Sequence, residues 1–581
     1  MAANLSFRDE RIDDVPFIIG LAKRLNLAEI VNQHLGTHGN QAGLHNGQLV
    51  VGWLGYILSQ ADHRKSAVRE WAHAALPDSL AHLLGQPLRE VDFSDDRLGG
   101  VLRRLSDDQA WAGIEQELWQ TTVMVYDLPR LDGVRLDSTT AYGHHQVTDE
   151  GLMQQGHSKD HRPDLPQVKL MAAAAEPHGQ LIACDVVAGQ RADDPLYTPL
   201  IQRVRSILGR SGLLYAGDCK MAALSTRAEL VLHEDHYLMP LPQTGETARQ
   251  MAGWIDVIVD GAQPASLIWE GARLLGGGYE FTRPQRASVP SAEGTTREIA
   301  WTERVQVVRS LSLAQAQAAG LEQRLQNASR ELLALTPPPG RGKRQIREEA
   351  ALQEAIQAVL ARHAVQGLLT VAWERHATSV QRQRGRGRPG PLRPTYTQSA
   401  VRYELSAVQR DAAAIAACQA RLGWRVQVTN APAERLSLAE AVCHYRDGWV
   451  LEHDFHLVKD LPLGLTPLFV WKDDQIKGMV RLLTLALRLL LLIEIQVRQS
   501  LALAAETLSG LYEGQPRRET ERPSGKRLLR AFARTQISLI CLETPAGTER
   551  HLTPLSPLLQ RILHYMRLPL SLYTDLAFNS S

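Results

Sequence analysis

VRLDSTT, residues 134–140, alternates apolar and polar side chains up to Asp137 and then carries three hydroxyl residues. Such alternation in a short run is typical of a β-strand, so we expect Asp137 at the end of a strand. Two further apolar runs, QVKLMAAAAE (residues 167–176) and QLIACDVV (residues 180–187), flank Pro177-His178-Gly179. Turn residues between two apolar runs predict a β-hairpin.

A helix and a fourth strand follow in the sequence. Residues 197–208 have helical spacing of apolar side chains, and LLYAG (residues 213–217) is a short apolar run that leads directly to Asp218. Three strands, a helix and a fourth strand predict a mixed α/β sheet.

The composition of the 581 residues is that of a globular protein. Apolar residues make up 44% and charged residues 22%, which excludes a disordered chain, a collagen and a coiled-coil rod. Lys and Arg number 64 and Asp and Glu 63, so the formal charge is +1. This balance argues against a uniformly basic nucleic-acid binder, although it leaves room for local basic patches.

Cysteine use and hydropathy predict a reduced, cytosolic protein without a membrane span. The five cysteines are scattered and no pair has CxxC spacing, which makes a zinc knuckle or a disulfide scaffold improbable. The first residues lack the pattern of a signal peptide. The most apolar run, residues 482–495, contains Arg488 and Glu494 and is too short to span a bilayer, so we expect a buried helix.

The rest of the chain divides around the predicted sheet. Helical patterns dominate the N-terminal region, which is compatible with a helix-turn-helix DNA reader or with any small helical bundle. After the sheet we expect a β-like stretch, a helical hairpin with a proline-rich tip at residues 337–340, and strands at 368–373 and 424–429 that return to the sheet. The expected divisions are a helical DNA-binding domain (1–128), the first part of the core (129–240), an insertion domain (241–430), the second part of the core (431–500) and a helical tail (501–581).

Polar residues recur on a helix predicted after the insertion. Tyr445, Trp449, Glu452, His456 and Lys459 follow at spacings of 4, 3, 4 and 3 residues, which would place all five on one helical face. A solvated charged face is the alternative, but the two aromatic residues count against it. A lone Asp at a strand end is likewise usually a turn or capping residue.

If Glu452 faces the two strand ends, three carboxylates converge with Asp137 and Asp218. Such a cluster is tolerated mainly when divalent cations neutralise it, and hard oxygen ligands suit Mg²⁺ or Mn²⁺. Two such ions can activate water or a 3′-hydroxyl in phosphodiester displacement. Lys459 is then expected to hold a DNA phosphate.

This order of residues resembles the DDE transposases of bacterial insertion sequences, whose catalytic core has a ribonuclease-H-like fold. One subgroup carries the signature Tyr, two residues, Arg, three residues, Glu, six residues, Lys. Tyr445, Glu452 and Lys459 match it, whereas Gly448 stands at the arginine position and Arg446 lies two residues earlier. LDSTT around Asp137, HSKDHRPDLPQVKL (residues 157–170) and AGDCKM around Asp218 also resemble the subgroup, and the resemblance extends over about residues 8–500.

The resemblance implies that Asp137, Asp218 and Glu452 are the catalytic and metal-binding triad for two Mg²⁺ or Mn²⁺ ions. It also implies contacts to double-stranded DNA through Tyr445, Arg446 and Lys459. The implied partners are the terminal inverted repeats of an element and a target DNA, bridged by a homodimer on the bacterial nucleoid.

Basic segments support DNA as the partner. Residues 375–394 contain six arginines and no acid, and Arg384, Arg386 and Arg388 lie in an Arg-Gly-Arg-Pro context that resembles an AT-hook. Such a strip can enter the minor groove, although a flexible solvated loop would have the same composition. The segment of residues 157–164, with Lys159 and Arg162, is expected to touch flanking DNA or to be an ordinary polar loop.

The sequence therefore predicts a DNA transposase. A metal-dependent nuclease without strand transfer would use the same triad. A catalytically inactive DNA-binding protein is the other alternative, and Gly448 is the residue that favours it.

Overall fold

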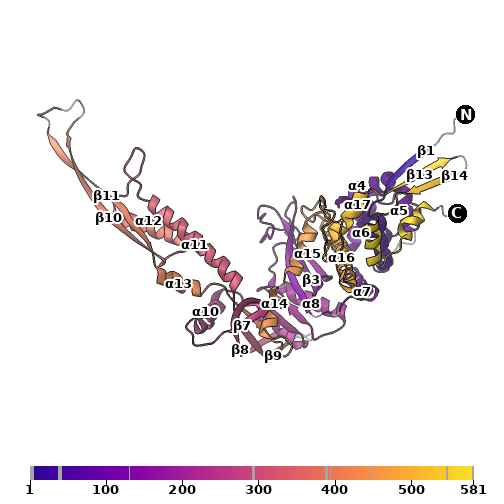
Figure 1. Cartoon of the computed structure of the whole chain (residues 1–581), viewed down its shortest axis with the longest axis horizontal. Helices are drawn as coiled ribbons and strands as arrows, with labels where there is room; N and C mark the ends of the chain where they lie inside the picture. Colours follow the sequence, from indigo (N-terminus) through magenta and orange to yellow (C-terminus); the bar gives the residue numbers. More distant parts are fainter. Residues whose placement is uncertain are drawn as a thin grey trace.

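The computed structural model describes residues 6–36, 42–129, 131, 133–290, 295–385, 390–392, 394–446, 448–544 and 547–578. Figure 1 shows a body that contains both chain ends and an arm that projects away from it. None of the helices in the described part of the chain is long and apolar enough to cross a membrane.

A mixed sheet of nine strands lies at the centre of the body, in the order β4-β3-β2-β5-β6-β12-β9-β8-β7. Its first five strands are β2 (Gly133–Tyr142), β3 (Gln167–Glu176), β4 (Leu181–Ala188), β5 (Leu214–Ala216) and β6 (His236–Pro240). β2, β3 and β4 pair antiparallel, whereas β5 and β6 run parallel to β2. The mixed α/β sheet predicted from the sequence is confirmed, and its strand arrangement is consistent with a ribonuclease-H-like core.

The strand β3, which lies next to the edge strand β4, is buried along its whole length because both faces of the sheet are covered there. Val168, Leu170, Ala172 and Ala174 point into a core shared with the terminal helices. Met171, Ala173 and Ala175 point into a second core under α8 (Asp194–Leu208). The period of two divides the strand between two layers of helices, as expected for a strand buried on both faces.

Beyond β6 the sheet continues into the segment expected to be an insertion. β12 (Trp424–Thr429) pairs with β6 and β9 (Thr296–Ser310), and β8 (Arg273–Pro290) and β7 (Ser266–Glu270) complete the edge. The expected return of residues 424–429 to the main sheet is thus observed. The same expectation for residues 368–373 is wrong, because β10 (Leu369–Gln383) pairs with β11 (Thr395–Arg410) in a separate two-stranded ribbon.

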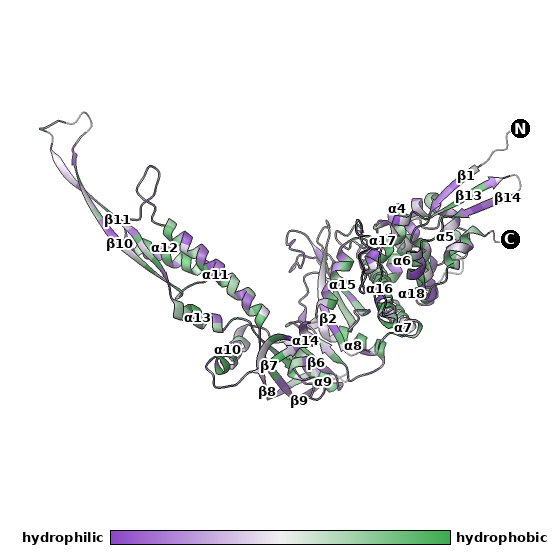
Figure 2. Ribbon diagram, in the orientation of Figure 1, coloured by the Kyte–Doolittle hydropathy of each residue, from purple (hydrophilic) through white to green (hydrophobic). Residues whose placement is uncertain are grey.

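The ribbon forms the arm together with the antiparallel helices α11 (Leu311–Ala334) and α12 (Glu349–Arg362). Leu321, Leu325, Ala328 and Leu332 make one buried stripe of α11, and Figure 2 shows this alternation as bands of colour along the helix. The stripe packs against α12 and the base of the ribbon in a core of its own. The arm is therefore stabilised by an apolar core that is separate from the cores of the body.

The N-terminal region contains helices but also a strand, so the expectation of an all-helical region is corrected. The helices are α1 (Val15–Arg24), α2 (Leu27–Leu35), α3 (Asn46–Gln60), α4 (Lys65–Glu70), α5 (Pro77–Leu84), α6 (Asp95–Leu105) and α7 (Asp108–Tyr126), with a π-helical turn at Trp71–Ala75. α1 and α2 are separated at Asn26, which adopts φ 51° in the left-handed region. The hydroxyl of Ser94 accepts the backbone N–H of Arg97 and so caps α6.

The strand is β1 (Ser6–Arg11), and it pairs with β13 (Ser538–Thr544), which in turn pairs with β14 (Gly547–Leu552). The C-terminal tail, expected to be helical, therefore combines this hairpin with α17 (Gly525–Thr535), α18 (Pro557–Tyr565) and α19 (Ser571–Thr574). Because β1 becomes a strand only by pairing with residues more than 500 positions away, no local pattern marked it.

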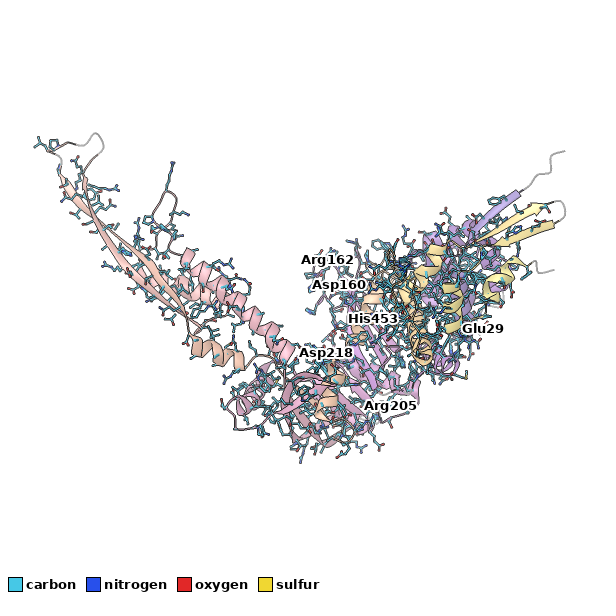
Figure 3. The ribbon with its side chains drawn as sticks, in the orientation of Figure 1. Glu29, Asp160, Arg162, Arg205, Asp218 and His453 are labelled. Carbon is cyan, nitrogen blue, oxygen red and sulfur yellow. The ribbon has the colours of Figure 1, made fainter. Side chains whose placement is uncertain are left out.

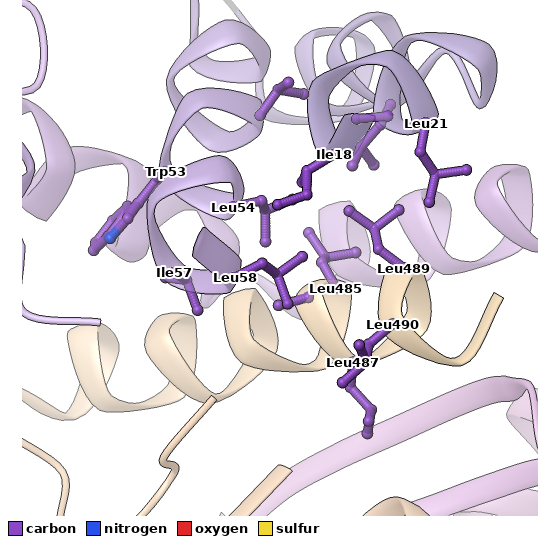
Figure 4. Close-up of a cluster of buried hydrophobic side chains, with 14 of the residues drawn as sticks. Ile18, Leu21, Trp53, Leu54, Ile57, Leu58, Leu485, Leu487, Leu489 and Leu490 are labelled. Atoms are coloured by element: carbon purple, nitrogen blue, oxygen red, sulfur yellow. The ribbon is translucent and has the colours of Figure 1, made fainter. Parts of the chain in front are cut away.

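A 32-residue helix, α16 (Asp473–Ala504), joins the terminal regions to the sheet. Figure 4 shows Ile18 of α1 and Leu54 and Leu58 of α3 facing Leu485 and Leu489 of α16. The apolar run of residues 482–495 lies inside α16 and is buried, as predicted.

Glu115 of α7 is fully buried and closes the free edge of the sheet. Its carboxylate accepts the backbone N–H of Cys184 in β4 at 2.9 Å and forms ion pairs with Arg203 of α8 and Arg488 of α16. Arg488 also donates to the carbonyl oxygens of Leu181 and Ile182 in the same strand. Side chains thus satisfy backbone groups that an edge strand would otherwise leave unpaired.

We expect Glu115→Ala to lower the free energy of unfolding in urea by about 3–5 kcal/mol, because it leaves Arg488 buried without its carboxylate. Glu246→Ala is the matched control, since Glu246 and Arg249 form an exposed ion pair at 2.9 Å. The control should cost less than about 1 kcal/mol. Equal costs for the two variants would contradict the role of Glu115.

Asp14, which precedes α1, is 3% exposed, and burial raises the pKa of its carboxyl to about 7. The folded protein therefore keeps Asp14 protonated at pH values where the unfolded chain ionises it. The wild type should lose stability relative to Asp14→Asn as the pH rises from about 4 to about 7. Thermal unfolding between pH 4 and pH 8 should show the melting temperature of Asp14→Asn moving about 3 °C above that of the wild type. The exposed Asp9→Asn should show no such divergence.

Candidate active site

A cavity of about 590 Å³ lies where β2, β5, the helix α15 (Trp449–Lys459) and the base of the arm meet. Asp137, Asp218 and Glu452 all line it. The strands bring the first two acids together because Arg135 of β2 pairs in parallel with Ala216 of β5, and an acid follows two residues after each. Figure 3 places Asp218 beside the base of the arm. The structure thus brings all three predicted acids to one cavity.

Asp137 is partly exposed and already paired with a cation. The ammonium group of Lys159 donates to Asp137 Oδ1 at 3.1 Å and to the carbonyl oxygen of Ser138 at 2.6 Å. Burial raises the pKa of the Asp137 carboxyl, and the charge of Asp218 adds to that rise, while Lys159 opposes it. The repulsion between Asp137 and Asp218 is the behaviour expected of neighbouring carboxylates.

Asp218 is held by a buried tyrosine that sequence reasoning missed. Tyr197 of α8 donates its hydroxyl to Asp218 Oδ1 at 2.8 Å, and the backbone N–H of Lys220 donates to the same oxygen at 2.9 Å. Burial and the charges of Asp218 and Asp137 raise the pKa of Tyr197, so its hydroxyl stays a donor. Tyr197 was visible in the sequence only as an apolar position of a helix.

Glu452 lies on an interrupted helix, which corrects the single helical face predicted for the residues from 445 to 459. α14 (Leu438–Arg446) begins at the predicted capping box of Ser437 and Glu440, and α15 begins only after Gly448. Tyr445 therefore belongs to a different helix from Glu452, although both line the cavity. Glycine is a poor helix former, which is a physical reason for the break.

The side chain of Arg135 occupies the space beside Gly448. A Cβ atom at position 448 would lie 2.8 Å from Arg135 Nη1. Arg135 is buried, pairs with Glu176 and donates to the carbonyl oxygen of His444 at 2.8 Å. Because Arg135 also lines the cavity, a guanidinium group stands next to the position where the signature arginine is absent. Arg446, for which the resemblance implied a DNA contact, lines the cavity as well but pairs with Glu270 at 3.1 Å.

The other predicted DNA contacts have protein partners. Lys459 forms an ion pair with Asp160 rather than presenting a free ammonium group, and Asp160 directly follows Lys159. Arg162 pairs with Asp164 at 2.7 Å and lies over the ring of Tyr142. The ion pair of Lys459 thus connects α15 to the loop that carries Lys159.

The basic tip of the ribbon is only partly described. Arg384 is exposed at the end of β10, whereas Arg386 and Arg388 lie outside the described residues. The exposed Arg425 of β12 lines the cavity and was not predicted, because a lone arginine in a strand carries no signal in the sequence.

Carboxylate oxygens are suitable ligands for a hard divalent cation, but in the structure the carboxylates of the cavity are not close enough together to coordinate one. Within the described ranges no three His, Cys, Asp or Glu side chains are close enough together to hold a metal ion. Three carboxylates around one cavity are nevertheless the donors that Mg²⁺ and Mn²⁺ prefer. Asp137 would have to exchange Lys159 for such an ion.

Comparison with known proteins agrees with this geometry, since residues 129–489 match the family model described as a transposase DDE domain. The chain belongs to this family. The matched region begins before β2 and ends within α16, so it contains all three acids of the cavity. DDE transposases act in DNA transposition and recombination and generally depend on divalent metal ions.

No curated protein gives a sequence match to this chain. One solved structure that it matches is a cryo-EM structure of the piggyBac transposase synaptic complex with hairpin DNA, at 9% sequence identity and a TM-score of 0.24. The match covers 50% of this chain and 61% of that chain, so it spans less than two thirds of that structure's chain.

The contact between Arg135 and Gly448 can be tested by a double-mutant cycle in this chain. We expect Gly448→Ala to cost about 1–2 kcal/mol in urea unfolding, because its Cβ would press on a buried guanidinium group. In an Arg135→Ala background the same change should cost at least about 0.5 kcal/mol less. Gly253→Ala is the control, since a Cβ at that helical position would meet open space. Strict additivity would show that Arg135 does not restrict position 448.

Proposed function

We propose that this chain is the transposase of an insertion sequence and that it cuts and joins phosphodiester bonds at the ends of its element. The observation that carries the proposal is the shared cavity of Asp137, Asp218 and Glu452, which come from two parallel strands and a helix of a DDE-family domain. Such an enzyme would work on the bacterial nucleoid in the cytoplasm.

Asp137, Asp218 and Glu452 would hold two Mg²⁺ or Mn²⁺ ions. When bound, such ions supply activation of the attacking water or 3′-hydroxyl and stabilisation of the leaving oxygen. The chain's own groups prepare the site. Tyr197 fixes one oxygen of Asp218 by its hydrogen bond and leaves the second free of it.

The ammonium group of Lys159 has two possible anionic partners at the cavity, the carboxylate of Asp137 and a DNA phosphate. In the structure its ammonium group neutralises Asp137, and the ion pair between Lys459 and Asp160 holds the loop that carries it. If Asp137 held a cation instead of Lys159, the ammonium group of Lys159 would be available for a DNA phosphate. The signature lysine Lys459 would then act by positioning Lys159.

Cationic groups at the cavity rim would position the DNA backbone. Arg425 and Arg446 line the cavity, and phosphate contacts of this kind give affinity without sequence reading. Joining an element to a target requires two ends to be held together, so we propose that two copies of the chain act on DNA as a homodimer.

We expect Asp137→Asn, Asp218→Asn and Glu452→Gln each to lower the rate of DNA cleavage roughly a thousandfold, since each removes a charged donor from the metal site. The assay uses purified protein, Mg²⁺ or Mn²⁺, and a plasmid that carries the inverted repeats bracketing the gene. Nicked and joined products are separated on a gel. Glu246→Gln, an exposed acid outside the cavity, is the control and should keep full activity.

Each result of this assay separates the proposal from its alternatives. Equal cleavage by wild type and Asp137→Asn would show that the triad is misassigned. Cleavage without joined products would identify a nuclease that lacks strand transfer. No cleavage by the wild type with either ion would identify an inactive DNA-binding protein.

A further inference from the structure

The outer half of the β10–β11 ribbon is not covered by any other element in the described part of the chain. α11 and α12 pack against Leu369, Tyr403 and Leu405 near the base of the ribbon. Residues 377–382 of β10 and 395–400 of β11 are all exposed. Figure 1 shows this part of the ribbon extending beyond the ends of both helices. A two-stranded ribbon is only marginally stable in water by itself, so the uncovered half of this ribbon is a candidate surface for a binding partner.

The charge of the outer ribbon indicates a polyanionic partner. Between Arg375 and Tyr403 the sequence contains seven arginines and no Asp or Glu. Glu374 and Glu404 mark the inner limit of this acid-free stretch and lie opposite each other in the ribbon. The sequence of the outer ribbon is therefore basic, and this charge complements DNA.

The pairing register separates the outer side chains into two faces, because directly opposed residues of an antiparallel pair point to the same side. One face carries Ser379 opposite Ser399 and Gln381 opposite Thr397. We call these four residues the amide–hydroxyl face. All four are exposed, and none donates or accepts a side-chain hydrogen bond to another described residue. They are neutral and can both donate and accept.

The opposite face of the outer ribbon has a different chemistry. It carries Thr378 opposite Ala400, Val380 opposite Gln398 and Arg382 opposite Tyr396. Thr378 bonds to the carbonyl oxygen of Ala400 within the ribbon. Mixed apolar, aromatic and charged groups do not form a continuous row of hydrogen-bonding side chains, so the amide–hydroxyl face is the better candidate for reading bases.

The dimensions of the ribbon fit the major groove of B-DNA, which admits a two-stranded antiparallel ribbon. Successive pairs on one face lie about 6.8 Å apart along the strands, close to the rise of two base pairs. Gln can bond adenine through two hydrogen bonds, and Ser and Thr bond several base edges. Two neighbouring pairs, Ser379/Ser399 and Gln381/Thr397, would therefore meet base edges about two steps apart.

We propose that the outer β10–β11 ribbon enters the major groove of double-stranded DNA and reads base sequence through the amide–hydroxyl face. Arg384 at the end of β10 would fix the ribbon on the phosphates. Gln383 has a separate part, since its side chain accepts from and donates to the backbone of Gly390 and so braces the tip. The inference rests on the proposed function only in taking DNA as the partner.

The test measures sequence preference with the full chain in EDTA, so that metal-dependent cleavage does not enter. Wild type is used to select duplexes from a pool with about 20 randomised base pairs, roughly two turns of B-DNA. The Kd for the selected duplex is then compared with the Kd for a scrambled duplex. The face variant is Gln381→Ala with Thr397→Ala, and the matched control on the opposite face is Thr378→Ala with Gln398→Ala.

We expect the face variant to lose about tenfold in the ratio of the two Kd values. Its affinity for the scrambled duplex and the salt dependence of that affinity should stay at wild-type values, since the arginines remain. The control should keep the wild-type ratio. Arg384→Ala should weaken binding to both duplexes alike and leave the ratio unchanged.

Three results would overturn the proposal. The wild type could select no sequence, or the face variant could keep the wild-type ratio. Sedimentation of DNA-free protein could also show a dimer that the face variant abolishes, which would assign the ribbon to a second copy of the chain. Each of these results leaves the cleavage assay with Asp137→Asn to be judged separately, and failure of that assay leaves this binding comparison unaffected.

Discussion

The buried cluster of Glu115, Arg203 and Arg488 is the constraint on which the rest of the body depends. One carboxylate and one guanidinium group complete the hydrogen bonding of the edge strand β4, and they come from helices more than 350 residues apart in sequence. Buried charges are tolerated only when all partners are present. The sheet edge, α7, α8 and α16 must therefore assemble together. This makes the N-terminal helices part of the catalytic body rather than a separate appendage.

The position of Glu452 follows from this assembly. Leu451, Phe455 and Val458 of α15 are buried in the same core as α16 and one face of β3, and the flank of α15 that carries Glu452 is directed to the cavity beside Asp137 and Asp218. Glu452 reaches the cavity because α16 supports α15 from behind. An acid on a loop would lack this support, and small displacements of a catalytic group are costly.

Features with a local periodic signal could be predicted from the sequence, and features made by distant contacts could not. β3 was predicted at its observed bounds, because its apolar pattern and the turn after it are local. The expectation that Asp137 ends a strand was wrong, because β2 continues to Tyr142 by pairing with β3, which no local pattern marks. Asp137, Asp218 and Glu452 were identified as neighbours by their order and resemblance. Tyr197, Arg425 and the guanidinium of Arg135 beside Gly448 were missed, since each depends on a tertiary contact. The break between α14 and α15 was also missed, because the spacing of 4 and 3 continues across Gly448.

The pairing of β1 with β13 has a consequence for biosynthesis. More than 500 residues separate the two strands, so at typical translation speeds β1 waits roughly half a minute to two minutes for its partner to emerge from the ribosome. During that time the backbone N–H and C=O groups of residues 6–11 lack the strand with which they pair in the folded protein. A nascent chain of this kind needs either prompt completion or protection by a chaperone, and copies interrupted by a late stop codon would be left with a permanently open edge.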